Sequence, residues 1–159
     1  MMDKNFIELL SALNACHAKY LIVGGYAVAV HAQPRGTKDI DIFYKAEPEN
    51  AQAVYQALAD FGAPLAGLTY LDFMISGKIY QFGRAPYQVD FMHQIDGVEF
   101  DDAWQKRLMI SVDATLQAPY ISSDLLVQNK LASGRPQDLA DVDAVRNARK
   151  AVTKPSPNK

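Results

Sequence analysis

Hydrophobic residues follow helical spacing in some segments of this chain and extended spacing in others, which predicts helices and strands in turn. The N-terminal part predicts an amphipathic helix over residues 6–17, a strand over Tyr20–Val23, a short helix over residues 26–32 and a strand over residues 38–44. Asp3 or Asn5 is expected to cap the first helix, because short polar side chains accept hydrogen bonds from free helix amides. The second helix should end before Pro34, since the residue preceding proline disfavours the helical conformation.

The rest of the chain continues the alternation. Its spacing predicts a helix over residues 47–61, strands over 73–75, 78–82 and 87–92, a short helix over 99–107, an edge hairpin over 108–112 and 115–120, and helices over 124–132 and 139–150. Gly62 is expected to end the first of these helices, and Pro119 to mark the limit of the hairpin. Ser122 or Ser123 is expected to cap the helix that follows.

The chain length of 159 residues is that of one domain. We expect residues 1–151 to form it and residues 152–159 to be a disordered tail. No apolar run approaches the roughly 18 residues of a membrane span, so no membrane partner is expected. The start of the chain has no signal-peptide pattern, which favours a cytoplasmic location. Cys16 is the only cysteine, which excludes an internal disulfide. We expect Cys16 itself to be a small residue of the core.

Charge is distributed unevenly along the chain. Residues 1–134 carry 10 Lys and Arg against 15 Asp and Glu, whereas residues 135–159 carry 6 against 3. A basic terminal segment can contact the phosphates of a nucleotide or an RNA. The same charges are equally compatible with a solvated helix face and a frayed end.

Two aspartates in the strand over residues 38–44 are the first candidates for chemistry. Successive side chains of a strand point to opposite faces, so Asp39 and Asp41 should share one face, about 7 Å apart, while Ile40 and Ile42 occupy the other. Two neighbouring carboxylates repel each other unless a cation lies between them. A hard divalent cation such as Mg²⁺, which prefers oxygen ligands, is the natural candidate.

Asp90 is the third candidate carboxylate, because it interrupts an otherwise apolar strand, where an unpaired charge is costly to bury. The alternative interpretation is a strand-end aspartate that faces solvent. Asp96 is a weaker rival, since it lies in a sequence typical of a turn.

Gly24-Gly25 directly follows the first strand and allows two interpretations. Without a Cβ the backbone can approach a phosphate closely at the start of a helix; alternatively, the glycines form a tight turn and nothing more. Arg35 likewise could contact phosphate or form a surface salt bridge, and His31 is expected to be a packed or helix-end histidine and not a ligand.

Taken together, Gly24-Gly25 and the sequence Arg35-Gly36-Thr37-Lys38-Asp39-Ile40-Asp41-Ile42 resemble the signature of the nucleotidyltransferase superfamily with the polymerase-beta-type palm. Within it the chain is most similar to the small prokaryotic branch that includes the toxins of abortive-infection toxin-antitoxin pairs. The resemblance implies an α+β fold, with a mixed β-sheet flanked by helices and further helices at the C-terminus. It also implies that Asp39, Asp41 and Asp90 are the metal-holding and catalytic residues.

The C-terminal sequence extends this resemblance. Asn129-Lys130-Leu131-Ala132 and Arg135 to Asp141 are similar to the family's last helices, in which the lysine and the arginine contact the nucleotide and the aspartate pair caps and orients. The implied nucleotide-binding residues are Gly24, Gly25, Arg35, Thr37, Lys130 and Arg135. From the residues alone, Asp138 is a good helix N-cap and Lys130 a cation near a helix C-terminus.

The resulting functional hypothesis is an enzyme that uses Mg²⁺ (or Mn²⁺) to move a nucleoside monophosphate from a nucleoside triphosphate to an acceptor hydroxyl. A tRNA or another RNA, a protein hydroxyl and a small molecule such as an aminoglycoside are all compatible acceptors. The toxin resemblance favours RNA and adds an antitoxin protein as a partner. The first alternative is an inactive nucleotide-binding or partner-binding module on the same fold; the second is a purely structural α/β protein.

Overall fold

The structure, a computed structural model, describes residues 2–32, 39–84 and 86–153. Within these ranges the strands form one six-stranded mixed sheet in the order β3-β4-β2-β1-β6-β5. The strands are β1 (Tyr20–Val23), β2 (Ile40–Tyr44), β3 (Tyr80–Arg84), β4 (Tyr87–Met92), β5 (Leu108–Ser111) and β6 (Gln117–Tyr120). At the centre, β2 pairs antiparallel with β1 and parallel with β4.

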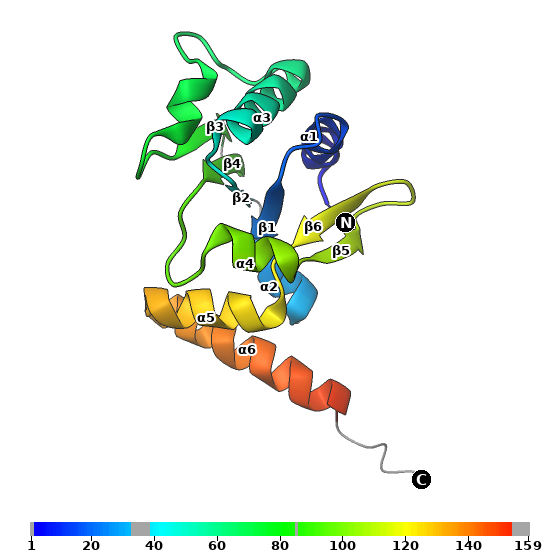
Figure 1. Cartoon of the computed structure of the whole chain (residues 1–159). Helices are drawn as coiled ribbons and strands as arrows, with labels where there is room; N and C mark the ends of the chain where they lie inside the picture. Colours follow the sequence, from blue (N-terminus) through cyan, green and yellow to red (C-terminus); the bar gives the residue numbers. More distant parts are fainter. Residues whose placement is uncertain (1, 33–38, 85, 154–159) are drawn as a thin grey trace.

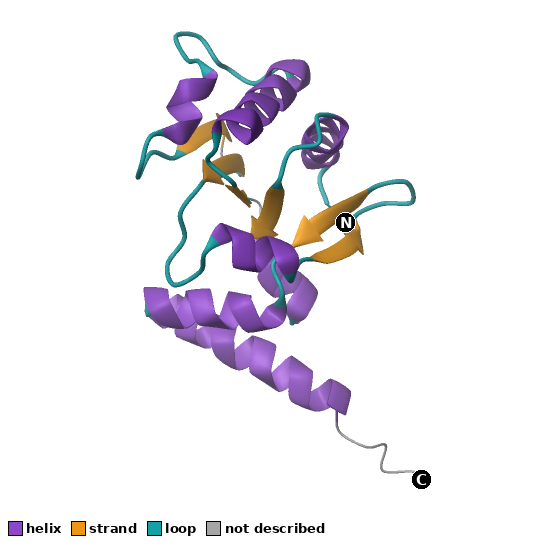
Figure 2. Ribbon diagram, viewed as in Figure 1, coloured by secondary structure: helices purple, strands orange, loops and turns teal. Residues whose placement is uncertain are grey.

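Helices cover both faces of the sheet (Figures 1 and 2). On one side lie α1 (Lys4–Ala15) and α3 (Pro48–Phe61), and toward the other lie α2 (Gly24–His31), α4 (Phe100–Gln105), α5 (Ser123–Ser133) and α6 (Pro136–Thr153). The expected α+β architecture with C-terminal helices is therefore confirmed. No helix in the described ranges has the length and apolar character that crossing a membrane would require.

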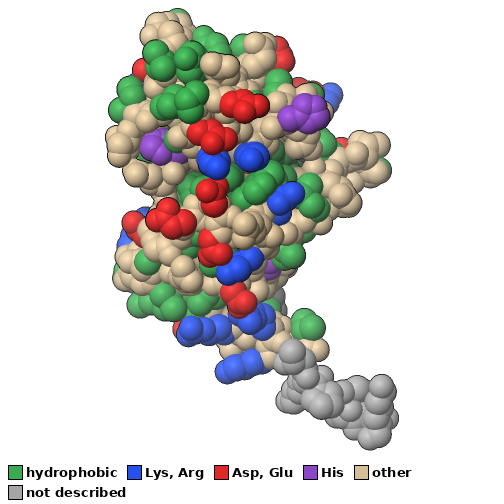
Figure 3. Space-filling model, viewed as in Figure 1, with side chains coloured by type: hydrophobic (Ala, Val, Ile, Leu, Met, Phe, Trp, Pro, Cys, Tyr) green, Lys and Arg blue, Asp and Glu red, His purple; other side chains and the backbone are tan. Residues whose placement is uncertain are grey.

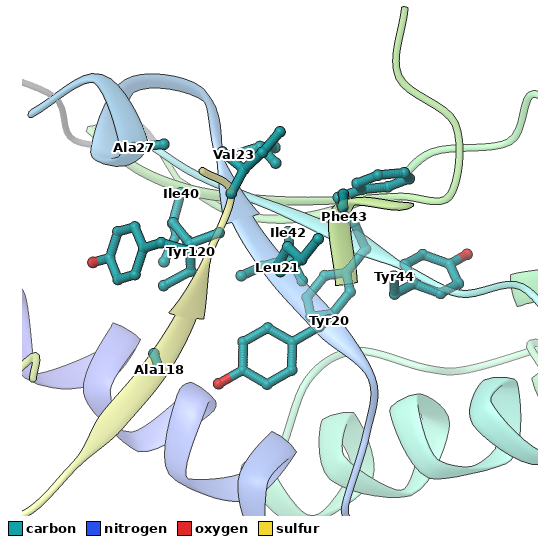
Figure 4. Packing of buried hydrophobic residues seen from close by; sticks show 14 of the residues in the cluster. Tyr20, Leu21, Val23, Ala27, Ile40, Ile42, Phe43, Tyr44, Ala118 and Tyr120 are labelled. Carbon is teal, nitrogen blue, oxygen red and sulfur yellow. The ribbon is translucent and has the colours of Figure 1, made fainter. Parts of the chain in front are cut away.

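The central strands are apolar on both faces because helices cover both faces of the sheet. Ile22 of β1 lies opposite Ile42 of β2, and Ile42 lies beside Phe91 of β4, all facing α1 and α3. Leu21 and Phe43, which are also register partners, are buried as well, and Phe43 packs edge to face against Phe100 of α4; Figure 4 shows this part of the core from close by. Strands covered on both faces read as continuous apolar runs. Against this background, any carboxylate on β2 or β4 is conspicuous.

Three expected helix ends are confirmed by their capping groups. The Asp3 side chain accepts a hydrogen bond of 2.8 Å from the Asn5 amide, so Asp3 caps α1. Gly62 ends α3 with a left-handed backbone conformation, and the Ser122 hydroxyl caps α5. These caps satisfy backbone groups that a helix end would otherwise leave without partners.

Three expectations were wrong. Residues 73–75 are not a strand: the short 3₁₀ helix η1 (Tyr70–Met74) occupies this region, and it buries Phe73 and begins with a capping box at Thr69. Pro119 lies inside β6 opposite Met109, where an antiparallel ladder points alternate amides away from the partner and tolerates a proline. The last helix begins at Pro136, so Asp138 lies in its first turn and is not its N-cap.

The end of the chain also differs from expectation. Residues 152–153 continue α6, although we expected the disordered tail to begin at residue 152. The remainder of that predicted tail, residues 154–159, lies outside the described residues.

Candidate active site

The junction of β1 and α2 is the first component of the site. Gly24 has φ +65°, a conformation that L side chains rarely adopt, and a Cβ added there would overlap the Asp41 carboxylate. Glycine is therefore required at this position for two independent reasons. No described side chain caps the N-terminus of α2, whose N-cap residue is Val23. The free amides at this end suit an anion.

Asp41 and Asp90 form the second component. They are register partners on the neighbouring parallel strands β2 and β4, and adjacent strands lie about 4.8 Å apart. Their carboxyl groups interact, since Asp90 is among the causes that raise the pKa of Asp41, and Gln88 Nε2 donates to Asp90 Oδ1 at 2.9 Å. Asp39 is exposed just before β2, where its Oδ1 accepts from the Gln88 amide at 3.3 Å. The structure therefore brings Asp41 and Asp90 into contact, with Asp39 next to them.

The pairing has an electrostatic consequence. Burial and, after it, the charge and hydrogen bond of Asp90 raise the pKa of Asp41 to about 6; Asp39 contributes in the same direction, and Lys130 opposes the shift. Two adjacent carboxylates resist simultaneous ionisation. A cation between them would remove this repulsion.

The donor set fits a hard cation, although the described residues contain no ready-made cluster of three or more His, Cys, Asp or Glu side chains around a metal position. The paired carboxylate oxygens of Asp41 and Asp90 are the ligand type that Mg²⁺ and Mn²⁺ prefer. Mg²⁺ usually keeps several waters and takes one or two carboxylates plus substrate phosphates. A pair of carboxylates is therefore enough to fit it.

A cavity of about 490 Å³ opens in front of Asp41. Its lining comes from the β1–α2 junction, from β2, from the residue before β3, from the end of β4 and the loop after it, and from α5 and the turn that follows it: Val23, Gly24, Asp41, Ile79, Met92, Gln94, Ile95, Asp96, Asn129, Lys130, Ser133 and Arg135. Gly24, Lys130 and Arg135, expected to bind nucleotide, thus lie around one cavity although they are distant in sequence. The volume is within the range of small-molecule sites.

Lys130 is held in place by two buried aspartates. Only 8% of the residue is exposed, and its Nζ lies 3.3 Å from Asp138 Oδ1 and 3.2 Å from Asp141 Oδ2. Arg135 Nε donates to the other Asp138 oxygen at 2.8 Å, while 75% of the Arg135 side chain stays exposed. Arg135 and, to a smaller extent, Lys130 hold the pKa of Asp138 below its ordinary value. The aspartates thus orient both cations.

The other candidates are distributed as follows. Arg35 and Thr37 lie outside the described residues. Gly25 is partly buried in the first turn of α2. His31 is packed, as expected, with its Nε2 2.7 Å from the carbonyl oxygen of Ile121. Cys16 is partly buried at the edge of the core, with its thiol 3.7 Å from Asp60.

Sequence reasoning underrated Asp96, which lines the cavity itself. It also missed the apolar lining formed by Ile79, Met92 and Ile95. No spacing rule points to these residues, because they come from separate segments: Ile79 precedes β3, Met92 ends β4, and Ile95 and Asp96 lie in the loop after β4. The direct contact of Lys130 with Asp141 was implied only in general terms, by the family's orienting aspartates.

Residues 2–149 match a protein family, DUF6036, described as nucleotidyltransferases of unknown function. This chain belongs to that family. The match covers nearly the whole chain, so the expected membership of the nucleotidyltransferase superfamily is confirmed, and the family supports a nucleotidyl-transfer activity in general terms. No curated protein matches the chain significantly.

Two solved structures share the fold of this DUF6036 member. A lincosamide antibiotic adenylyltransferase, LnuA, in its lincomycin-bound form, aligns with a TM-score of 0.55 and 16% identity over 93% of this chain and 98% of that chain. A putative nucleotidyltransferase from Thermotoga maritima, TM1012, aligns with a TM-score of 0.53 and 16% identity over 96% and 95%. At such identity the likeness extends to the fold alone.

Proposed function

We propose that this protein transfers a nucleoside monophosphate from a nucleoside triphosphate to an acceptor hydroxyl, with pyrophosphate as the leaving group and Mg²⁺ or Mn²⁺ as cofactor. One observation carries the proposal: Asp41, paired with Asp90, shares a cavity with Lys130 and Arg135. A metal-bound triphosphate requires both kinds of group, carboxylates for the metal and cations for the remaining phosphate charge.

The carboxylates Asp41 and Asp90 would hold the metal, with Asp39 as a further ligand. When bound, the metal would polarise the phosphate oxygens, lower the pKa of the acceptor hydroxyl and stabilise the leaving pyrophosphate. Carboxylate ligands must be deprotonated to bind. Because the pKa of Asp41 is about 6, this requirement is met at neutral pH and lost in mild acid.

The remaining residues would bind and orient the triphosphate. Gly24 and Gly25 would let the phosphates approach the free amides at the start of α2. Lys130 would act as a fixed point charge, because Asp138 and Asp141 hold its ammonium group. Arg135, which is more exposed, would reach over the bound phosphates. Arg35 and Thr37, which precede β2 in the sequence, would add donors.

For the acceptor we favour an RNA such as a tRNA, and with it a toxin role, an antitoxin partner and a cytoplasmic location. The support is the basic end of α6. Arg146, Arg149 and Lys150 are exposed there, and Figure 3 shows Lys and Arg side chains gathered at this end of the molecule. Lys and Arg that neutralise phosphates provide most of the affinity for nucleic acid. Arg149 also pairs with Asp124 at 2.7 Å, so part of this charge is engaged within the protein.

Pyrophosphate release tests the proposal. Wild type is incubated with each nucleoside triphosphate, Mg²⁺ or Mn²⁺, and bulk tRNA, in parallel with Asp41→Asn and Asp90→Asn. Glu8→Gln is the matched control, because Glu8 is exposed on α1, which lies on the side of the sheet opposite to α2 and α5. We expect turnover in wild type and the control, and a loss of at least about a hundredfold in both Asn variants.

Other outcomes separate the alternatives. Metal-dependent nucleotide binding without turnover for any acceptor, including small-molecule hydroxyls, would favour the inactive binding module. Turnover that survives in Asp41→Asn would contradict the proposed role of the carboxylate pair.

A further inference from the structure

The loop between β4 and α4 carries an aspartate in a fixed position. Figure 1 shows this loop passing the C-terminal end of α5. Asn129 Nδ2 donates to the backbone oxygen of Asp96 at 2.9 Å, and Gln128 Nε2 donates to that of Gly97 at 2.6 Å. The Ser133 hydroxyl donates to Asp96 Oδ2 at 3.0 Å. Both the backbone and the carboxylate of Asp96 are therefore positioned by α5, which also carries Lys130.

Asp96 faces the cavity that we assign to the nucleotide, which Gly24, Asp41 and Arg135 also line. The charges of Asp96 and Asp41 both act on the Arg135 guanidinium, whose pKa is raised chiefly by Asp138. Asp96 is separate from the Asp41–Asp90 pair, since its carboxylate bonds to Ser133 on α5. It is a second carboxylate beside the proposed phosphate-binding cations.

An ionised carboxylate only accepts hydrogen bonds. The phosphates of a nucleoside triphosphate offer no donor at neutral pH, so within the nucleotide only the nucleoside can donate a hydrogen bond to Asp96. The ribose hydroxyls and the amino groups of bases are the available donors. Ribose is bonded directly to the phosphates, so a carboxylate next to Lys130 and Arg135 lies within its reach. The apolar residues Ile79, Met92 and Ile95 offer the base a different lining of the cavity.

We propose that Asp96 accepts hydrogen bonds from the ribose hydroxyls of the donor nucleotide and makes the protein select ribonucleotides over deoxynucleotides. The inference rests on the proposed function, because it assigns the cavity to a nucleoside triphosphate. Ser133 is then a positioning residue, since its hydroxyl orients the Asp96 carboxylate.

Nucleotide binding without an acceptor provides the test. Affinities of the four ribonucleoside triphosphates and of their 2′-deoxy and 3′-deoxy forms are measured calorimetrically with Mg²⁺, for wild type, Asp96→Ala and Ser133→Ala. The charge control is Glu99→Gln, an exposed residue of the same loop. Because a hydrogen bond to a charged group is strong, we expect wild type to bind ribonucleotides roughly ten to a hundred times more tightly than a deoxy form.

The variants separate the possible roles of Asp96. Asp96→Ala should weaken ribonucleotide binding by that same factor and leave deoxynucleotide binding almost unchanged, Ser133→Ala should reduce the preference in part, and Glu99→Gln should preserve it. Wild type that binds nucleotides without a ribose preference overturns the inference and leaves the proposed function intact. An Asp96→Ala variant that alters the choice of base while the ribose preference persists also overturns it. Wild type that binds no nucleotide overturns both proposals.

Discussion

Replacing Gly24 by alanine tests the β1–α2 junction most sharply, because the structure separates two effects of the added methyl group. The first is backbone strain at φ +65°, about 1–2 kcal/mol for a residue with a Cβ. The second is overlap with the Asp41 carboxylate. The overlap can be relieved only by turning the Asp41 side chain about χ1, and even then its Cβ stays close to the added methyl group, so a further cost in stability is expected. The same rotation removes Asp41 from the position in which it would hold the metal.

Gly62→Ala is the matched control. Gly62 also has positive φ, +92°, but an added Cβ would meet nothing within 4 Å. Gly62→Ala should therefore lose about 1–2 kcal/mol of unfolding free energy, a Tm decrease of roughly 2–8 °C for a chain of this size, and Gly24→Ala should lose at least as much. Gly24→Ala should in addition lose about a hundredfold in pyrophosphate release, since displacement of a positioned group by about 1 Å has this effect. Gly62→Ala should keep its activity.

The assay combines thermal unfolding with initial rates of pyrophosphate release for the three proteins. The reasoning is refuted if Gly24→Ala is destabilised like the control and retains activity within a fewfold of wild type. In that case Gly24 would serve only to turn the chain.

Three further changes probe the charged groups. Lys130→Met removes one cation shared by the buried Asp138 and Asp141, while Asp138 keeps its ion pair with Arg135, so we expect a loss of about 3 kcal/mol in unfolding free energy, and a Tm within 2 °C of wild type would contradict this. Arg135→Ala removes a largely exposed side chain and should weaken nucleotide binding, measured by calorimetry, by about tenfold. The Tm in thermal unfolding should fall much less than in Lys130→Met. A large fall in Tm with little loss of nucleotide binding would argue against a binding role for Arg135. In the folded protein the pKa of Asp41 is raised to about 6. The protonated Asp41 side chain therefore stabilises the fold at a pH below the ordinary pKa of an aspartate, and this stabilisation is lost as the pH rises through about 6. Asp41→Asn should therefore raise the Tm of metal-free protein at about pH 8 and change it little at about pH 4, and Mg²⁺ should raise the Tm of wild type but not of this variant; a variant that melts lower than wild type at about pH 8 would contradict the assignment.

The sequence was most informative where local patterns decide the structure. The apolar strand around Asp90 marked that residue as a carboxylate that needs a partner, and the structure places it beside Asp41. Capping residues and glycines located the helix ends. The central carboxylate pair could therefore be anticipated, because β2 and β4 are short, apolar and buried.

Tertiary contacts decided the remainder. Phenylalanine is common in strands, which led us to expect one at Phe73. The capping box at Thr69 and the burial of the Phe73 ring against Tyr44 and Tyr80 favour a 3₁₀ helix instead. Asp138 looks like an N-cap in sequence, whereas its burial between Lys130 and Arg135 gives it an orienting role. Asp96 looks like turn chemistry until Asn129 and Ser133 of α5 are seen to fix it beside the cavity. These contacts join segments that are distant in the sequence, so no periodic pattern of residues predicts them.

The most direct test of the central claim follows the transferred group itself. Purified protein is incubated with Mg²⁺, bulk tRNA and nucleoside triphosphates labelled at either the α-phosphate or the γ-phosphate, alongside Asp90→Asn. Our account predicts that wild type makes the α-label acid-insoluble on RNA, that the γ-label leaves as pyrophosphate, and that the variant transfers neither. Transfer of the γ-label, or α-label transfer that Asp90→Asn retains in full, would contradict the assignment of this site to metal-dependent nucleotidyl transfer.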